Sequence, residues 1–523
     1  MSPLRPTRQF TLKPTAHGLA IGFTLVMLFS AGLTQAQAQG SAPAWLPDIQ
    51  SFEVSAPEQP DAVLIRNATI WTATDAGILE NTDLLIEDGE IAAIGSELDL
   101  PRGAIEIDAG GRHITPGIID AHSHAAIVGG VNEATTISTA HVRIEDVIDA
   151  DSINIYRQLA GGVTTINLLH GSANAIGGQM QVIKLRWGAK PDGLIFSEAP
   201  AGIKFALGEN PKQSNWNNEV PRYPQTRSGV AQIIREKFQT AKDYQRRKDN
   251  QPSGRAARNA VPFKVNYELE AIADILSGDQ RIHSHAYRAD EMVMLIELAD
   301  EFGVTIGTFQ HVLEGYKLAK RMAEHGVGGS TFIDWWNFKY EATDAIGFNP
   351  ALMHQAGVVT GLHSDNPELA RRMNLEAAKA VRYGNVPEHE ALKMITAYPA
   401  EQLGVDDFVG HLAEGMHADL VIWNGHPLSV YSRVDQTWVD GRKYFDREAD
   451  LAARVQLENE RQELIAMVLA EGGDEGDGED TGAEEELSSK LLGYSQWELD
   501  HDEFCTAHVH TRSLGLNFVK GNR

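Results

Sequence analysis

Two histidines at the end of an apolar run carry the clearest chemical signal in this chain. His122 and His124 follow Ile118 and Ile119 within the run Asp120-Ala-His-Ser-His. Side chains two positions apart on a β-strand project from the same face. One divalent metal ion could therefore bind both imidazoles without distortion of the backbone. A His-x-His pair alone is a weak signal that ordinary strands also contain, so its meaning depends on the rest of the chain.

The elements that would position these histidines lie between two strand-rich patches. Residues 62–107 predict short strands with a hairpin turn at Asp88-Gly89, and residues 415–444 predict further strands around a second Asp-Gly pair. Roughly three hundred residues between the patches alternate apolar strands with helical patterns, which favours a parallel α/β sheet. Periodicity alone does not distinguish a closed barrel from an open doubly wound sheet.

The composition indicates a large, acidic and mostly folded protein. The chain has 523 residues, of which 42% are hydrophobic, and a formal net charge of −27. This length suits a large barrel with appendages. Because such a charge repels nucleic acid and anionic membranes, we expect a small-molecule substrate and no nucleic-acid partner. Homo-oligomerisation is left open. The acidic, glycine-rich segment from 471 to 486 predicts solvated disorder, since its spacing does not fit a calcium loop.

The N-terminus has the pattern of an export signal. Basic residues precede an apolar stretch over 18–33, and Ala36-Gln-Ala38 is a small-x-small cleavage site. The apolar stretch is shorter than a typical membrane span. We therefore predict a signal peptide over residues 1–38, a periplasmic or secreted protein, and no stable membrane span after processing. An uncleaved anchor is the alternative. The single cysteine, Cys505, excludes an internal disulfide.

Longer runs resemble the amidohydrolase superfamily, the metal-dependent hydrolases of amide and related bonds. The run from Ile114 to His124 is similar to the signature that ends the first barrel strand of that superfamily. Thr396–Gly404 (Thr-x-x-Pro-Ala-x-x-Leu-Gly) and Gly415–Trp423 (Gly-x-x-Ala-Asp-Leu-Val-x-Trp) resemble its imidazolonepropionase-like branch. The resemblance covers residues 62–447. It implies a distorted (β/α)8 TIM barrel with a small β-sandwich domain built from the segments that flank the barrel.

This resemblance defines the expected domain organisation. After the signal peptide, we predict a linker or arm over 39–61, a first sandwich segment over 62–112, the metal-dependent barrel over 113–405, a second sandwich segment over 406–447, and a helical, acidic and partly disordered tail over 448–523.

The resemblance also implies the remaining metal ligands, because barrel enzymes place catalytic groups at the carboxyl ends of their strands. The run that contains His285 (His-Ser-His-Ala-Tyr-Arg-Ala-Asp) resembles the fifth-strand segment of the branch and assigns the ligand to His285. His283 faces the same side and is the alternate. A strand that ends in His311 corresponds to the sixth. The run Gly-Leu-His-Ser-Asp365 resembles the eighth, whose aspartate binds metal and handles the proton.

A lysine inside a short apolar strand bears on the number of metal ions. Lys204 lies in Ala-Gly-Ile-Lys-Phe-Ala-Leu-Gly. In two-metal members of the superfamily, a fourth-strand lysine is carboxylated and its carbamate bridges two cations. An uncarboxylated ammonium there would repel the metals. The resemblance thus implies two divalent ions bridged by carboxylated Lys204. Zinc suits the imidazole and carboxylate ligands, and manganese, iron and cobalt are the alternatives. The alternatives are Glu198 as the bridge and a surface role for Lys204.

The chemistry that this ligand set implies is hydrolysis of a C–N bond in an amide, cyclic amide or dipeptide. Metals supply hydroxide near neutral pH. Asp365 would take the proton of the attacking water and deliver it to the leaving nitrogen. A rival interpretation comes from His311-Val-Leu-Glu314, which resembles the His-x-x-Glu of mononuclear deaminases and allows deamination or single-metal ring opening. A non-catalytic binding scaffold is a second rival, of another class.

Three residues are candidates for substrate binding. Tyr287 and Arg288 follow the fifth-strand ligand, where a guanidinium could bind a carboxylate through paired donors. An ion pair between Arg288 and a neighbouring acid, Asp290 or Glu291, is the structural alternative. His170 lies in a glycine-rich loop after the second expected strand.

Two further segments have open roles. A polar insertion over 208–262, with helical periodicity over 228–246, is placed to act as a lid or is a surface excursion. Near the C-terminus, Cys505, His508 and His510 could bind metal, but a fourth ligand is not evident, so we expect a solvated or packed tail.

Overall fold

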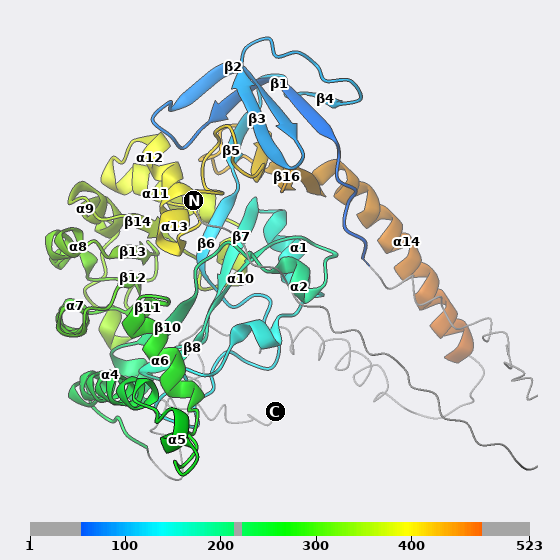
Figure 1. The fold of residues 1–523 in the computed structure, drawn as a ribbon. Coiled ribbons are helices and arrows are strands. Elements are labelled where there is room, and N and C mark those ends of the chain that lie inside the picture. Colours follow the sequence, from blue (N-terminus) through cyan, green and yellow to red (C-terminus); the bar gives the residue numbers. More distant parts are fainter. Residues whose placement is uncertain (1–53, 214–221, 473–523) are drawn as a thin grey trace, which may run out of the picture. The chain divides into compact units, whose positions relative to one another are not determined.

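The computed structural model describes residues 54–213 and 222–472, and Figure 1 shows their helices and strands. The predicted signal peptide, most of the predicted arm, the tail beyond Gly472 and the Cys505, His508 and His510 group lie outside these residues. Within the described ranges, no helix has both the length and the apolar character that crossing a membrane requires.

Strands from both flanks of the chain share one eight-stranded sheet, in the order β17-β16-β15-β5-β1-β2-β3 with β4 paired to β1. The central contact is between β5 and β15, which pair antiparallel although they are far apart in sequence. The prediction that the two strand-rich patches come together is confirmed. The strands are β1 (Ala62–Trp71), β2 (Ile78–Glu87), β3 (Glu90–Gly95), β4 (Ile105–Asp108), β5 (His113–Pro116), β15 (Leu420–Trp423), β16 (Val434–Val439) and β17 (Arg442–Asp446).

Both predicted hairpin turns are confirmed. Asp88 and Gly89 have φ angles of 49° and 88° between β2 and β3, and Asp440 and Gly441 have 49° and 70° between β16 and β17. Two successive positive φ angles match the twist of the flanking strands, which is why Asp-Gly is favoured here. A Cβ on Gly89 would lie 2.9 Å from Asp440 O. The two turns therefore touch, and glycine is required there for space as well as for its φ angle.

The central segment forms two sheets, one of six strands in the order β14-β13-β12-β11-β10-β8 and one of three in the order β6-β7-β9. Strands β10 to β14 run parallel to one another, as do β6 and β7, so the predicted parallel α/β arrangement is confirmed. Every residue of β6, β7 and β10 is buried. Burial on both faces is typical of parallel sheets in α/β proteins. The strands are β6 (Ile118–Ser123), β7 (Val163–Leu168), β8 (Ile176–Gln179), β9 (Gln181–Lys184), β10 (Gly202–Ala206), β11 (Arg281–Ala286), β12 (Ile306–His311), β13 (Gly328–Thr331) and β14 (Thr360–Leu362).

One extended segment departs from the parallel arrangement and joins the two sheets. β8 runs antiparallel to β10, and β9 runs antiparallel to β7. Between them, Met180 N donates to Gly202 O at 2.9 Å. Residues 176–184 thus lie between β7 and β10, in the place that a uniform barrel would give to its third parallel strand.

Backbone contacts also connect β14 to β6. Asp365 N donates to His122 O at 3.1 Å, and Ser364 N donates to Asp120 Oδ1 at 3.0 Å. The segments that hold the first and the last predicted metal ligands are therefore adjacent.

Helices cover the outer side of the central strands, and in Figure 1 α7, α8 and α9 lie outside β11 to β13. The helices are α1 (Ile153–Leu159), α2 (Pro191–Leu194), α3 (Glu209–Gln213), α4 (Arg227–Asp249), α5 (Gly254–Ala257), α6 (Tyr267–Ser277), α7 (Ala289–Phe302), α8 (Ala319–His325), α9 (Asn349–Gln355), α10 (Pro367–Ala370), α11 (Met373–Gly384), α12 (Glu388–Lys393), α13 (Ala397–Leu403) and α14 (Arg447–Gly472).

The predicted helix of the polar insertion is confirmed as α4. Thr226 caps its first turn by accepting a hydrogen bond from Gly229 N at 3.0 Å. On its buried face, the ring of Phe238 lies 6.0 Å from that of Phe205 on β10 and 5.2 Å from that of Phe302 on α7. Because these rings belong to one hydrophobic core, α4 is packed as a structural helix of the central segment.

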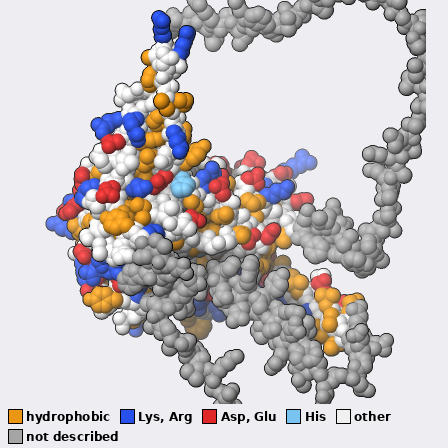
Figure 2. Space-filling view, turned by 90° about the horizontal axis from the view of Figure 1, so that it is seen from below, with side chains coloured by type: hydrophobic (Ala, Val, Ile, Leu, Met, Phe, Trp, Pro, Cys, Tyr) orange, Lys and Arg blue, Asp and Glu red, His pale blue; other side chains and the backbone are white. Residues whose placement is uncertain are grey.

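The predicted helical start of the C-terminal tail corresponds to α14. All its side chains from Leu451 to Leu469 are exposed. Elsewhere, the face of the molecule that Figure 2 shows has acidic and basic side chains interspersed among hydrophobic ones.

A buried ion cluster ties the central segment to the flanking sheet. Lys184, the last residue of β9, places Nζ 3.1 Å from Asp419 Oδ1 and 2.5 Å from Asp440 Oδ1. The Lys184 and Asp419 side chains are 0% and 2% exposed. Charges removed from water to this extent are tolerated only when each is compensated by a partner.

Replacement of Lys184 by alanine should therefore destabilise the fold by about 3–5 kcal/mol, because it leaves the buried Asp419 charge without its cation. The measurement is the free energy of unfolding in urea. The control is Lys443→Ala, whose partly exposed pair with Asp446 should contribute less than about 1 kcal/mol. Equal losses in the two variants would contradict the assigned role of Lys184.

Candidate metal centre

Three of the predicted histidine ligands meet around the carboxylate of a fourth predicted ligand, Asp365. His122 Nε2 and His124 Nε2 each lie 3.3 Å from Asp365 Oδ1, and His311 Nδ1 lies 3.9 Å from Asp365 Oδ2. The Asp365 side chain is fully buried, and within the described residues neither of its oxygens accepts a hydrogen bond. A buried carboxylate of this kind is suited to a metal ion.

The other two predicted ligands lie at the edges of the same cluster. Lys204 Nζ is 3.4 Å from His122 Nε2, and the ring centroids of His285 and His311 are 4.7 Å apart. Both ring nitrogens of His285 are buried, and neither makes a hydrogen bond to the described part of the chain. The structure therefore brings all six predicted residues together.

Strand ends position these side chains. His122 lies on β6, Lys204 on β10, His285 on β11 and His311 at the end of β12, while Asp365 follows β14. The backbone of His311 has φ 71° and that of Asp365 has φ 49°. Residues other than glycine rarely adopt such angles. Strained positions of this kind cluster at functional sites, where surrounding contacts hold them.

Two of the histidines have a fixed orientation. His122 Nδ1 lies 3.3 Å from Gln310 Oε1, and His124 Nδ1 lies 2.9 Å from Leu169 O. Carbonyl oxygens only accept hydrogen bonds, so each Nδ1 carries the proton and each Nε2 presents its lone pair towards Asp365. A second hydrogen bond of this type is the usual way in which a protein orients a metal-binding imidazole.

The imidazoles of the cluster are held in their neutral, ligand-competent form. Burial lowers the pKa of His122, His285 and His311 well below the usual value, and the positive charge of Lys204 lowers each further. Neutral histidine is the form that binds metal. Buried neutral imidazoles, free ring nitrogens on His285 and a carboxylate without hydrogen bonds together fit a divalent ion such as zinc.

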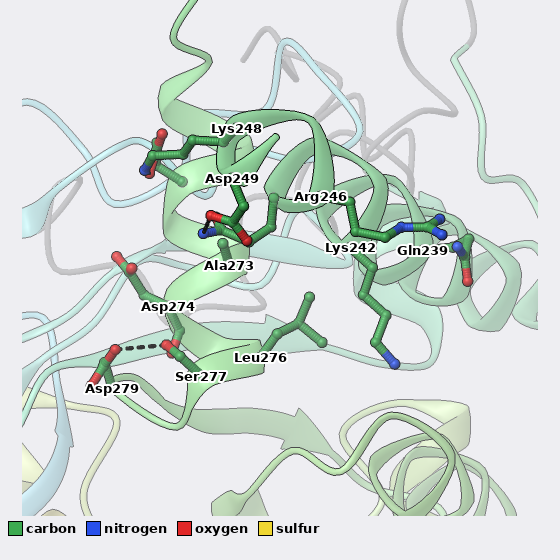
Figure 3. A pocket seen from close by; sticks show the side chains of 12 residues that line it. Gln239, Lys242, Arg246, Lys248, Asp249, Ala273, Asp274, Leu276, Ser277 and Asp279 are labelled. Carbon is green, nitrogen blue, oxygen red and sulfur yellow. Dashed lines mark hydrogen bonds and ion pairs between the residues drawn. The ribbon is translucent and has the colours of Figure 1, made fainter. Parts of the chain in front are cut away.

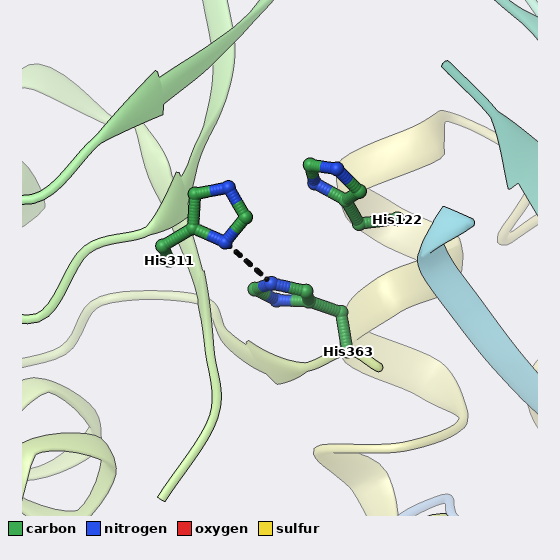
Figure 4. Close-up of side chains that lie close together, drawn as sticks. All are labelled: His122, His311 and His363. Atoms are coloured by element: carbon green, nitrogen blue, oxygen red, sulfur yellow. Dashed lines mark hydrogen bonds between the residues drawn. The ribbon is translucent and has the colours of Figure 1, made fainter. Parts of the chain in front are cut away.

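A further histidine, His363, belongs to the cluster and was not among the predicted residues. Its ring stacks on that of His122 at a centroid distance of 5.2 Å, and its Nε2 lies 3.0 Å from His311 Nδ1 (Figure 4). The ligand atoms of His122, His311 and His363 lie within 4.8 Å of one another, as do those of His122, His124 and Asp365. His363 stands two positions before Asp365, so the same-face spacing that identified the first histidine pair was a usable signal here too.

The two alternate ligands lie outside the cluster. In the register of β11 with β12, His283 lies opposite Thr308 and His285 lies opposite Gln310, the neighbour of His311. His283 is therefore two residues further than His285 from the carboxyl end of β11. The geometry favours His285 as the ligand. Glu198 is exposed and accepts a hydrogen bond from Ser197, so this competing bridge is wrong.

The predicted substrate-binding residues have different surroundings. The Tyr287 ring lies 4.6 Å from that of His285 and 5.2 Å from that of His311, so it borders the cluster. Arg288 Nε lies 3.0 Å from Asp290 Oδ1, which is the ion pair expected as the structural alternative. His170 is buried, and its two ring nitrogens bond the backbone at Gly171 and Glu133.

Glu314, the glutamate of the His-x-x-Glu run, makes its contacts outside the histidine cluster. Glu314 Oε2 accepts a hydrogen bond from Ala289 N at 2.9 Å, at the start of α7, and Glu314 Oε1 lies 3.2 Å from Lys317 Nζ. Both carboxylate oxygens are therefore engaged in contacts outside the histidine cluster.

A separate cavity of about 700 Å³ lies between α4 and α6 (Figure 3). Its charged side chains are of both signs, and Lys248 Nζ pairs with Glu270 Oε2 at 2.5 Å. Its lining contains no histidine. The histidine cluster is thus the better candidate for chemistry.

Comparison with known proteins identifies the family of the chain. The model of the amidohydrolase family matches residues 113–444. Amidohydrolase tasK of Hapsidospora irregularis is 31% identical over 430 residues, which cover 73% of this chain and 43% of that protein. The chain therefore spans less than half the length of this relative. Imidazolonepropionase of Cereibacter sphaeroides is 23% identical over 408 residues, which cover 71% of this chain and 96% of that protein.

A solved structure supports the same assignment. The crystal structure of an amidohydrolase from Thermotoga maritima MSB8 has 33% sequence identity and a TM-score of 0.68, and the match covers 74% of this chain and 100% of that one. This neighbour gives the central segment a TIM-barrel-type fold. The chain belongs to the amidohydrolase family and is a metal-dependent hydrolase that acts on C–N bonds.

Proposed function

We propose that this protein is a two-metal hydrolase that cleaves the C–N bond of an amide, cyclic amide or dipeptide, with Asp365 as the proton carrier. The observation that carries the proposal is the position of Asp365. Its carboxylate lies within 3.3 Å of two imidazole nitrogens that present lone pairs, and it accepts no hydrogen bond from the described residues. It is therefore available both to a metal and to a proton.

The ligands divide into two sets. His122, His124 and Asp365 would hold one metal ion, and His285 and His311 would hold a second, with Lys204 between the sets. Metal ions bound there supply hydroxide near neutral pH and polarise the scissile carbonyl. Zinc suits these imidazole and carboxylate ligands.

The charge of Lys204 supports the proposal that this residue is carboxylated. Its ammonium lowers the pKa of His122, His285, His311 and His363, so its field acts throughout the cluster. The same field opposes the binding of a cation. Reaction of the neutral amine with carbon dioxide forms a carbamate and releases a proton. This replaces a positive charge with a negative one and adds two oxygens that can each bind a metal.

Asp365 would act in two steps. It takes the proton from the attacking water as a general base, and it then delivers that proton to the leaving nitrogen as a general acid. The backbone hydrogen bond from Asp365 N to His122 O, at 3.1 Å, keeps the segment that carries the carboxylate beside β6 through both steps.

The substrate would lie against Tyr287. This side chain belongs to a small hydrophobic cluster with Phe332, packed against Trp335 and Phe338, which would exclude water from the scissile bond. Arg288 is about one third exposed in its pair with Asp290. Because exposed pairs are weak, a substrate carboxylate could replace Asp290. His170 would hold the glycine-rich loop in place through its two backbone hydrogen bonds.

Deamination on one metal is the less favoured alternative. It needs a glutamate that faces the substrate, whereas Glu314 caps α7 and pairs with Lys317. We also propose export, directed by residues 1–38. A mature N-terminus near Gln39 in protein purified from its native host would support it, and an intact N-terminus would not.

Replacement of Asp365 by asparagine should lower kcat by about 10²–10⁴-fold, because the amide cannot accept the proton of the attacking water. We expect the purified variant to retain bound metal. Turnover is measured against N-acyl amino acids, dipeptides and cyclic ureides, and metal by elemental analysis. Asp300→Asn is the matched control, since Asp300 is 55% exposed and pairs with Arg321. A fully active Asp365→Asn enzyme would rule out this mechanism.

Replacement of Lys204 by methionine should reduce the metal content from two ions per chain to one or none, because the bridging anion is lost. Elemental analysis after loading with zinc and bicarbonate gives the count. Lys320→Met, at a lysine whose side chain is 89% exposed, should keep two. Two ions in the Lys204→Met variant would refute the carbamate bridge, and one ion in the wild type would favour the mononuclear alternative.

A further inference from the structure

We propose that His363 is a positioning residue that, together with Ser330, sets which nitrogen His311 presents to the metal centre. The inference rests on the proposed metal centre. His311 Nδ1 lies 3.0 Å from His363 Nε2, and His363 Nδ1 lies 3.0 Å from Ser330 Oγ. All three residues are completely buried. They form a continuous hydrogen-bonded chain that ends at a predicted metal ligand, and Figure 4 shows its contact between His311 and His363.

The geometry assigns His363 to orientation and not to metal binding. Distance alone would allow it as a ligand, since its ring lies beside those of His122 and His311. Both of its ring nitrogens are already engaged, however, one by His311 and the other by Ser330. A neutral imidazole has one donor and one acceptor nitrogen, so His363 has no lone pair left for a metal ion.

The hydrogen-bonded chain allows two arrangements of the same protons. In the first, His311 Nδ1–H donates to His363 Nε2, and His363 Nδ1–H donates to Ser330 Oγ, so that His311 Nε2 carries a lone pair. In the second, Ser330 O–H donates to His363 Nδ1, and His363 Nε2–H donates to His311 Nδ1, so that His311 Nε2 carries a proton. Every ring is neutral in both. Only the first arrangement allows His311 to bind a metal through Nε2.

The surroundings of His311 Nε2 favour the first arrangement once a metal binds. This nitrogen is buried and makes no hydrogen bond to the described residues. A proton there would be a buried donor without an acceptor, which is unfavourable. A lone pair there is the ligand that a metal ion needs. Metal binding therefore selects one proton arrangement of the chain.

His311 differs in this respect from the other oriented ligands. His122 and His124 donate to carbonyl oxygens, which cannot donate in return, so their tautomers are fixed by the fold. The partner of His311 can donate or accept. Two residues of β13 act on His311. Thr331 Oγ1 donates to the backbone oxygen of His311 at 2.8 Å, and Ser330 acts on the His311 ring through His363.

The test compares His363→Phe with His363→Gln. Phenylalanine keeps the ring that stacks on His122 but has no nitrogen, so zinc affinity should fall by about 10–100-fold, the usual effect of losing such a partner. Glutamine places a carbonyl oxygen near the position of Nε2. It should accept from His311 Nδ1–H and restore most of the affinity. Ser330→Ala should give an intermediate loss. Affinity is measured by competition with a chelator.

A second readout does not depend on activity. Nitrogen-15 NMR of histidine-labelled, metal-free protein reports which nitrogen of His311 is protonated. We expect Nδ1 to be protonated in His363→Gln and a mixture of tautomers in His363→Phe. His283→Phe is the matched control, because His283 is a buried histidine on β11 outside the cluster, and it should bind zinc as the wild type does.

Two results would overturn the inference. Wild-type zinc affinity in His363→Phe would show that His363 does not orient His311. Equal losses in His363→Phe and His363→Gln, with one fewer ion per chain, would show that His363 is itself a ligand. Both leave the proposed metal centre intact. A wild-type chain that binds no zinc would instead refute the metal centre, and this inference with it.

Discussion

The backbone hydrogen bond from Asp365 N to His122 O is the contact on which the candidate centre depends. It joins the segment after β14, the last strand of the central segment, to β6, the first. It thereby places the Asp365 carboxylate against His122, on β6, and His124, just after β6. The flanking sheet supports the same junction, because Gly117 N, just before β6, donates to Asp419 O at 2.9 Å. Strands from both ends of the chain thus fix where β6 begins.

Burial then determines the chemistry that the cluster can perform. Imidazoles in bulk water would be partly protonated near neutral pH, whereas burial lowers the pKa of His363 to about 3 and that of His122 well below its usual value. The cluster is therefore rich in lone pairs and poor in protons. Such a site attracts metal ions. It also leaves Asp365 as the carboxylate that can carry a proton between water and a leaving group.

The sequence predicted the ligands because the motifs that carry them are local. His122 and His124 lie two positions apart at the end of an apolar run, and the runs that contain the other ligands resemble motifs of the family. What it could not predict depends on contacts between distant segments. The hydrogen bond from Glu133 N to His170 Nε2 involves a loop with no pattern of its own. The antiparallel direction of residues 176–184 has no signature in residue types, since it depends on pairing with β7 and β10.

For His363, the sequence indicates the position of the residue but not its role. Its spacing from Asp365 is visible in the sequence, but its role depends on Ser330, which lies on a different strand. A residue type and a strand position identify a side chain that can reach the centre. They do not identify which of its two nitrogens is engaged, because that depends on the hydrogen-bond partner across the sheet.

The roles of two buried lysines also depend on their surroundings and not on residue type alone. Lys184 and Lys204 each follow an isoleucine in a short apolar strand, and both are fully buried. Lys184 faces the carboxylates of Asp419 and Asp440, so its charge is compensated and its role is to hold two sheets together. Lys204 faces imidazoles, and its charge acts on the histidines of the metal centre. Burial of a lysine is therefore not by itself a sign of function. The sign is a buried lysine whose charge lowers the pKa of the histidines that would bind a metal ion, because a carbamate in its place would favour the cation that the ammonium opposes.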